Sequence, residues 1–145
     1  MIAALGARFG RETRVLNLDL RPETFDVEVQ DPAVPTHVDR FTFEDGSFGE
    51  PAPVPVGRSR KRLEAQLFPL AEVDLAILPR LLAEAKERAR TEGGEATHVR
   101  IERAAGSSDY ESWGRPVIRV FVLGPRGSAF VEYGLDGKKQ DVKRW

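Results

Sequence analysis

Strict alternation between apolar and polar side chains is the feature that most limits how this chain can fold. It is clearest at Phe25–Gln30, where Phe25, Val27 and Val29 alternate with charged or polar residues. This period of two is typical of a strand that rests one face on a core. Similar patterns predict further strands at residues 13–20, 37–44, 97–103, 117–123, 128–133 and 140–144. We therefore expect an antiparallel sheet with one covered face.

Alternation also assigns side chains to faces. In the first predicted strand, Leu16, Leu18 and Leu20 fall on one side, and we expect all three in the core. In the second, Asp26 and Glu28 fall on the side away from the core, and we expect both carboxylates to be solvated. Paired carboxylates act as acid and base when burial separates their pKa values, so this pair is not expected to be catalytic.

One segment has the period of a helix instead. Apolar residues recur at steps of three and four along residues 75–92, which places Leu75, Leu78, Leu82, Ala85 and Ala89 on one stripe. Pro79 lacks the backbone N–H that a helix interior needs. We therefore expect a short turn at 74–78, capped by Asp74, and the main helix from about residue 79. A shorter helix is expected at 2–9.

The two halves of the chain share this order of elements. Three matches carry the likeness: Thr13-Arg14-Val15 with Thr97-His98-Val99, Phe25–Val29 with Ile118–Val122, and Asp45-Gly46 with Asp136-Gly137. One such unit is too small to bury its sheet face, whereas two can share a longer sheet. The predicted fold is α+β: one compact domain at 1–145, made of two helix-plus-antiparallel-sheet repeats (about 1–56 and 72–145) that form a shared sheet backed by helices. A Pro-rich and basic connector at about 49–71 joins them.

This repeated pattern resembles the PepSY-like fold, whose tandem version is the β-lactamase-inhibitor-like fold. The resemblance is carried by the helix Leu75–Glu92, the strand Ile118–Val122 and the turn Leu135-Asp136-Gly137, with an echo at Glu44-Asp45-Gly46. Members of such families are typically non-catalytic and envelope-associated, and they bind proteins or peptides through the sheet surface or its loops. The resemblance implies a protein- or peptide-binding accessory domain of a bacterial protein.

Composition removes several kinds of chemistry. The chain has no cysteine, which excludes disulfides, thiolate metal sites and thiol nucleophiles. Its two histidines, His37 and His98, lie far apart in strand patterns, so we expect surface residues and not metal ligands. There is no glycine-rich phosphate loop. We expect no catalytic residue, no metal and no cofactor.

The best candidate for binding is the predicted loop Ala104–Gly114, which is an insertion relative to the first repeat. It carries Tyr110 and Trp113, and Arg115 and Phe121 follow it. Large aromatic side chains in irregular segments commonly anchor protein interfaces. The competing interpretation is that Trp113 folds back to cover an edge of the sheet.

Two other functions stay open. One is a small-molecule binder or enzyme with a cavity between helix and curved sheet, although the strand faces Phe25–Val29 and Val120–Val122 place no polar residue inward. The other is association with nucleic acid through the basic run Arg58, Arg60, Lys61 and Arg62. With 22 basic and 23 acidic residues the charges nearly cancel, so nucleic acid is not the expected partner.

The sequence has no run of about 18 apolar residues, so no membrane-spanning segment is expected. The N-terminal residues 1–9 are apolar but lack the basic region of a signal peptide. The chain as written predicts a cytoplasmic protein, and an export sequence upstream would place it in the cell envelope.

Overall fold

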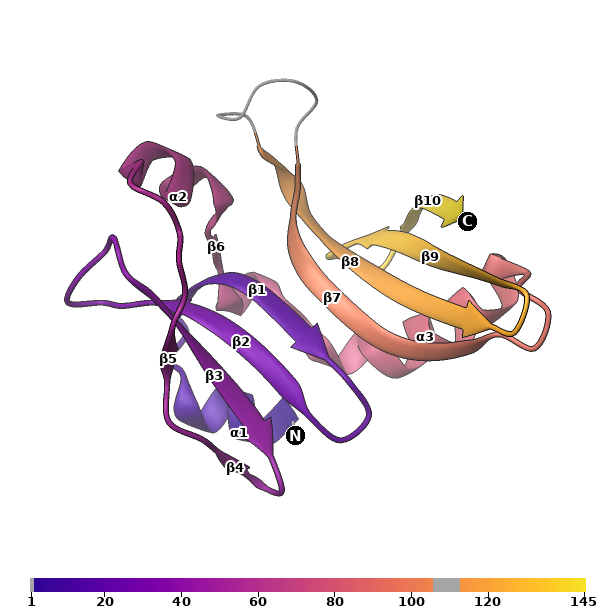
Figure 1. Cartoon of the computed structure of the whole chain (residues 1–145), viewed down its shortest axis with the longest axis horizontal. Helices are drawn as coiled ribbons and strands as arrows, with labels where there is room; N and C mark the ends of the chain where they lie inside the picture. The colour runs from indigo at the N-terminus through magenta and orange to yellow at the C-terminus, as the bar shows by residue number, and fades with distance from the viewer. Residues whose placement is uncertain (1, 106–112) are drawn as a thin grey trace.

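A single antiparallel sheet runs through the whole molecule (Figure 1). The computed structural model describes residues 2–105 and 113–145. Its ten strands are β1 (Arg14–Leu20), β2 (Phe25–Gln30), β3 (Val38–Glu44), β4 (Ser47–Phe48), β5 (Ala52–Pro53), β6 (Phe68–Pro69), β7 (Glu95–Ala105), β8 (Trp113–Gly124), β9 (Gly127–Gly134) and β10 (Lys139–Arg144). The helices are α1 (Ile2–Arg8), α2 (Arg60–Gln66) and α3 (Leu78–Ala89), with two 3-10 turns, η1 (Leu70–Glu72) and η2 (Leu75–Ile77). The predicted α+β class with a shared antiparallel sheet is confirmed.

The long strands follow the spatial order β10-β9-β8-β7-β1-β2-β3-β4, with β5 on β3 and β6 on β1. The first and second halves therefore meet where β1 pairs with β7. At this seam Leu18 lies opposite Ile101, and Asp19 lies opposite Arg100. Backbone hydrogen bonds between β1 and β7 therefore join the two halves into one sheet.

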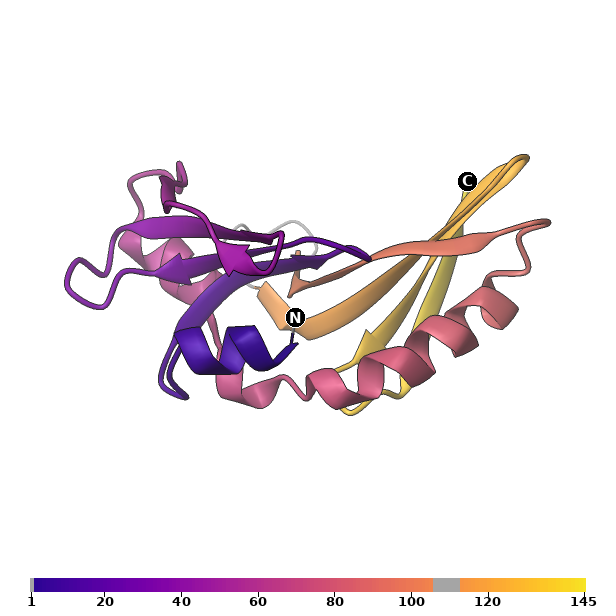
Figure 2. The same ribbon diagram turned by 90° about the horizontal axis from the view of Figure 1, so that it is seen from below.

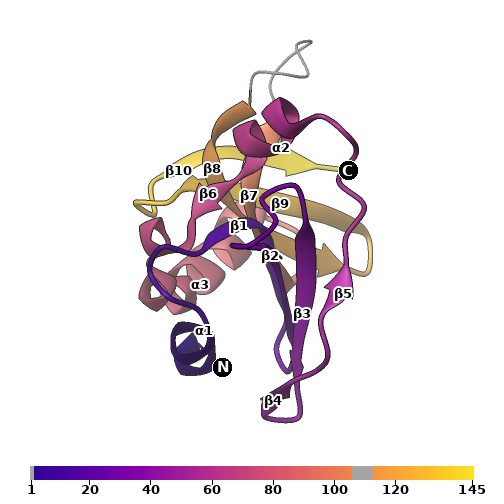
Figure 3. The same ribbon diagram turned by 90° about the vertical axis from the view of Figure 1, so that its left-hand side faces the viewer.

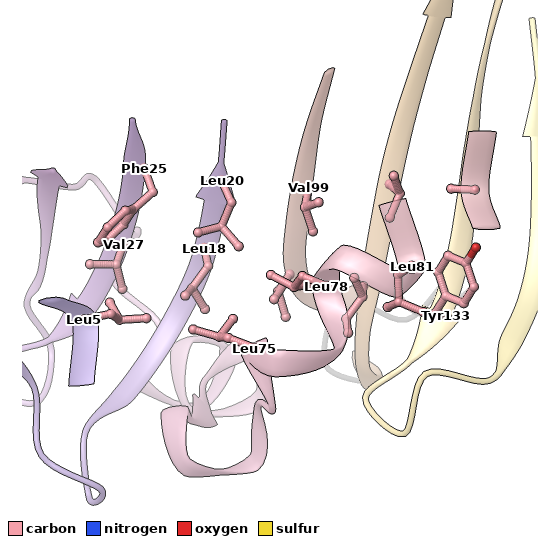
Figure 4. Close-up of a cluster of buried hydrophobic side chains, with 14 of the residues drawn as sticks. Leu5, Leu18, Leu20, Phe25, Val27, Leu75, Leu78, Leu81, Val99 and Tyr133 are labelled. Atoms are coloured by element: carbon pink, nitrogen blue, oxygen red, sulfur yellow. The ribbon is translucent and has the colours of Figure 1, made fainter. Parts of the chain in front are cut away.

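Helices α1 and α3 cover the same face of the sheet (Figure 2). Between them and the strands lies one continuous core, which Figure 4 follows from Leu5 and Phe25 to Leu81 and Tyr133. Each fully buried Leu or Phe contributes about 2 kcal/mol relative to an exposed one. Because this core is continuous beneath both halves, we expect them to unfold together.

Helix α3 forms much as its sequence predicts. Asp74 caps the preceding 3-10 turn by accepting a hydrogen bond from the backbone N–H of Ala76, and Pro79 lies in the first turn of the helix. The buried stripe differs at one position, because Leu81 is fully buried and Leu82 only partly.

The connector forms more structure than its composition predicts. Its basic run lies at the start of α2, where the Ser59 side chain accepts a hydrogen bond from the Arg62 backbone N–H. Leu63 and Leu67 then pack on Val38 in a second small core. In Figure 3, helix α2 lies near the top of the molecule and α1 in its lower part.

One predicted face and one predicted exposure are wrong. Leu16 belongs to the second small core and not to the main one, because a bulge between Val15 and Asn17 changes the alternation along β1. Glu28 is only 8% exposed, since the Arg40 guanidinium on the neighbouring strand donates to it at 2.7 Å. Alternation identifies the face of Glu28 correctly, but it does not reveal that a long neighbour covers it.

Candidate functional site

The outer face of β7, β8 and β9 carries a continuous group of apolar and aromatic side chains. Val120 and Val122 point into the core, so Phe121 between them points away from α3. The group comprises His98, Phe121, Leu123, Phe130 and Trp145, which we call the aromatic face. The strands that carry it occupy the right-hand half of the sheet in Figure 1.

The rings of the aromatic face form a row across neighbouring strands. The His98 and Phe121 rings stack with centroids 4.1 Å apart and planes 8° from parallel. Phe121 and Phe130 are 5.5 Å apart, and Phe130 meets Trp145 edge-on at 5.6 Å. Strand pairing sets this spacing, because His98 lies opposite Phe121 and Phe121 lies opposite Phe130.

Part of the aromatic face is well exposed. Trp145 is 65% exposed and Leu123 is 45% exposed, while Phe121 and Phe130 are half-buried. Large apolar side chains grouped on a surface mark sites where another molecule binds more often than scattered ones do.

Positive side chains lie above these rings. The Arg119 guanidinium is 5.5 Å from the centre of the Phe130 ring, and the Lys143 ammonium is 5.8 Å from it. The Arg100 guanidinium is 6.0 Å from the Phe121 ring. These are cation–π distances, so the rings help to hold all three cations, and Arg100 and Arg119 are also held by acidic neighbours.

A row of ion pairs runs beside the rings. Arg119 donates to Glu102 at 2.7 Å and to Glu132 at 2.9 Å, and so links β7, β8 and β9. Arg100 donates to Asp19 at 2.9 Å across the seam between the two halves. Because the strands hold both partners of each pair, these charges give the face a fixed shape.

His98 is held in its neutral form by its surroundings. Burial lowers its pKa, and the cationic Arg100 and Arg21 lower it further, while the nearby Asp19 raises it. A neutral imidazole stacks on Phe121 as an aromatic surface and carries no charge at pH 7. Within residues 2–105 and 113–145, no group of three or more histidine or acidic side chains is placed to hold a metal ion.

The residues singled out from the sequence lie in different places. Phe121 lies in the centre of the aromatic face, and Arg115 is exposed farther along β8. The backbones of Trp113 and Ala105 pair across the β7–β8 hairpin, whereas Tyr110 lies outside the described residues.

The basic run is not part of this site. Arg58, Arg60, Lys61 and Arg62 are exposed at the start of α2, over the other half of the molecule (Figure 1). The acidic Glu64 lies one turn along the same helix, and Arg14 and Arg60 lower its pKa. The charge of the basic run is therefore partly balanced locally.

Sequence reasoning missed the other members of the aromatic face. Phe130 stands between two core residues, Ala129 and Val131, so alternation alone could have placed it outside with Phe121. The contributions of His98 and Trp145 depend on the pairing of strands, which a linear pattern does not specify.

The space between α3 and the sheet is filled with side chains. Leu78, Leu81, Ala85 and Ala89 are each 6% exposed or less, and they pack on Val120 and Val131 among others. Within the described residues, this interface is lined by apolar groups and by the ring of Tyr133.

Comparison with known proteins supports the fold alone. No family model and no curated protein matches the chain. A crystal structure from Clostridium difficile 630, described as a "putative lipoprotein", is similar over 99% of this chain and 90% of that one, with a TM-score of 0.63 and 10% sequence identity. None of the described helices is long and apolar enough to cross a membrane. The chain therefore shares its overall architecture with this bacterial protein.

Proposed function

We propose that this chain is a non-catalytic module that binds a protein or peptide through the aromatic face. The observation that carries the proposal is the row of half-buried and exposed rings on the outer side of a sheet whose inner side carries the main core. Aromatic anchors of this kind supply most of the energy in many interfaces. Ion pairs and strand pairing hold the rings in place, so little conformational entropy is lost on binding.

We further infer that the chain is a duplicated, PepSY-like fold. The order α1-β1-β2-β3 in the first half resembles α3-β7-β8-β9 in the second. The pairing supports this, since Val27 lies opposite Leu18 and Ile118 lies opposite Ile101, and Leu18 and Ile101 pair with each other at the seam. The two strand pairs are thus arranged as equivalents about the middle of the sheet, in a register that matches Ile118 with Val27 and not, as in the sequence alignment, with Phe25.

The cell envelope is the compartment we propose. The likeness to a bacterial "putative lipoprotein" over nearly the whole chain supports it. The family that the sequence resembles is also envelope-associated. An accessory domain there would recruit another protein without transforming a substrate.

A peptide-display selection tests the binding function. The wild-type chain is used to enrich binding sequences from a random library, and affinities are then measured for two variants. Phe130→Asn removes a ring from the aromatic face and should weaken the enriched peptides about tenfold or more. Val34→Asn, at an exposed apolar residue in the β2–β3 loop, is the matched control and should leave affinity unchanged. Equal binding by both variants would overturn the proposal.

A further inference from the structure

Beside the aromatic face, one end of the molecule is lined by basic side chains. A groove of about 380 Å³ lies between the segment Arg90–Glu92 after α3, the turn Arg126–Ser128, and the C-terminal Arg144 and Trp145. A second groove of about 360 Å³ shares Arg90 and Arg144 with the first. It adds Arg88, Lys139 and Asp141, among others. We call the two together the basic groove.

Its positive charge exceeds the negative charge around it. Five basic residues line the basic groove, together with the two acidic residues Glu92 and Asp141. One of the five, Arg88, is paired with Glu84 at 2.5 Å, which leaves Arg90, Arg126, Lys139 and Arg144 as the cations in excess. One carboxylate oxygen of Asp141 also accepts a hydrogen bond from the Val142 backbone N–H. The surplus favours an anionic ligand.

Arg144 is fixed in position by the end of α3. Its guanidinium donates to the Ala89 carbonyl at 2.8 Å and to the Arg88 carbonyl at 3.0 Å. These carbonyls form the negative end of the helix dipole, where a cation is favoured. Arg90 and Arg126 are exposed and supply the charges that can reach a ligand.

The basic groove meets the aromatic face at Trp145. Trp145 lines the groove and also packs on Phe130, and Lys143 lies above the Phe130 ring. A single extended segment can therefore contact the rings with apolar side chains and the arginines with carboxylates.

We propose that the partner is an extended peptide segment that combines aromatic or large apolar residues with acidic ones. This inference rests on the proposed binding function and names the chemistry of its partner. Nucleic acid fits less well, because it carries a phosphate at every nucleotide. Glu132, Glu92 and Asp141 are interspersed with the cations and would repel such a continuous negative charge.

The test uses short fluorescein-labelled peptides and fluorescence polarisation. One probe alternates Glu with Phe, and a matched probe alternates Gln with Phe. The wild type should bind the acidic probe about tenfold more tightly, and added salt should reduce that preference. The double variant Arg90→Gln/Arg126→Gln should abolish the preference, while Arg58→Gln, at an exposed arginine of the other half, should retain it.

The outcomes separate this inference from the function it rests on. Equal affinity for both probes, with both weakened by Phe130→Asn, would overturn the acidic preference and keep peptide binding. Failure of either probe to bind would overturn the inference, and the display selection would then decide the function. Tighter binding of a single-stranded DNA probe than of the acidic peptide would also overturn it. A preference for the acidic probe in Arg90→Lys/Arg126→Lys would support the inference, because lysine keeps the positive charge. Thermal melting checks that each variant is folded.

Discussion

Replacing Tyr133 by phenylalanine should stabilise the protein. Tyr133 is fully buried, and its hydroxyl has no hydrogen-bond partner among the described residues. A buried hydroxyl without a partner costs about 1 to 3 kcal/mol, because it has lost its hydrogen bonds to water. Phenylalanine keeps the ring that packs against Leu81 and removes only that oxygen (Figure 4). We expect the free energy of unfolding to rise by about 1 kcal/mol.

Alkaline pH should enlarge this difference. Burial raises the pKa of Tyr133 to about 12, while the unfolded chain has the ordinary value of 10.0. Between these values the unfolded state releases the proton and the native state retains it, so stability falls as pH rises from 10 to 12. A shift of about two pH units corresponds to about 2 to 3 kcal/mol. Tyr133→Phe lacks this loss.

Urea denaturation at pH 7 and at several values above 10 measures both effects. The wild type and Tyr133→Phe share every other titrating group, so their difference isolates Tyr133. The slope of the transition with urea should be the same for both proteins. Destabilisation of Tyr133→Phe at pH 7 would refute the reasoning, because it would show that the hydroxyl has a hydrogen-bond partner.

Three further substitutions test other parts of the structure. Leu81→Ala should lower the free energy of unfolding by about 3 kcal/mol in urea denaturation, since it leaves a cavity between α3 and the sheet. Gly137→Ala should lower the melting temperature, because Gly137 has φ of 78° and an added Cβ would meet Arg80. A fall in melting temperature smaller than the fall caused by an Ala→Gly substitution within a strand would count against this explanation. The lowered pKa of His98 means that stability falls as pH drops below about 6.5, because the unfolded chain binds the proton first. His98→Phe keeps the stack on Phe121 and should lack this acid-dependent loss. An unchanged acid dependence in that variant would assign the effect to other groups.

Local sequence patterns correctly predicted the elements whose structure does not depend on contacts with distant segments. The limits of β2 agree with its alternation to the residue, and the start of α3 follows from Pro79 and Asp74. Asp45 and Gly46 both adopt positive φ, as expected of a tight hairpin turn. In each of these cases the determining forces lie within a few residues along the chain.

The missed features depend on contacts between distant segments. The bulge that turns Leu16 away from the main core is a property of how β1 pairs with β2, and α2 gains its stability from Leu63 and Leu67 packing on Val38. Helix α2 has only seven residues and a basic first turn, so it is too short to be stable alone and its charges oppose the helix dipole. Tertiary packing therefore decided these parts of the fold.

Among residues 2–105 and 113–145, the two halves of the outer sheet face differ in how far other segments cover them. In the first half, α2 and the segment around β5 bury Leu16 and Val38 under apolar side chains. In the second half, β10 follows β9 directly at the edge of the sheet, and the outward residues Leu123 and Trp145 stay 45% and 65% exposed. The main core lies on the inner side of both halves, so we expect the rings of the aromatic face to be replaceable without unfolding the protein. This separation of stability from binding is what allows Phe130→Asn to serve as a test of function.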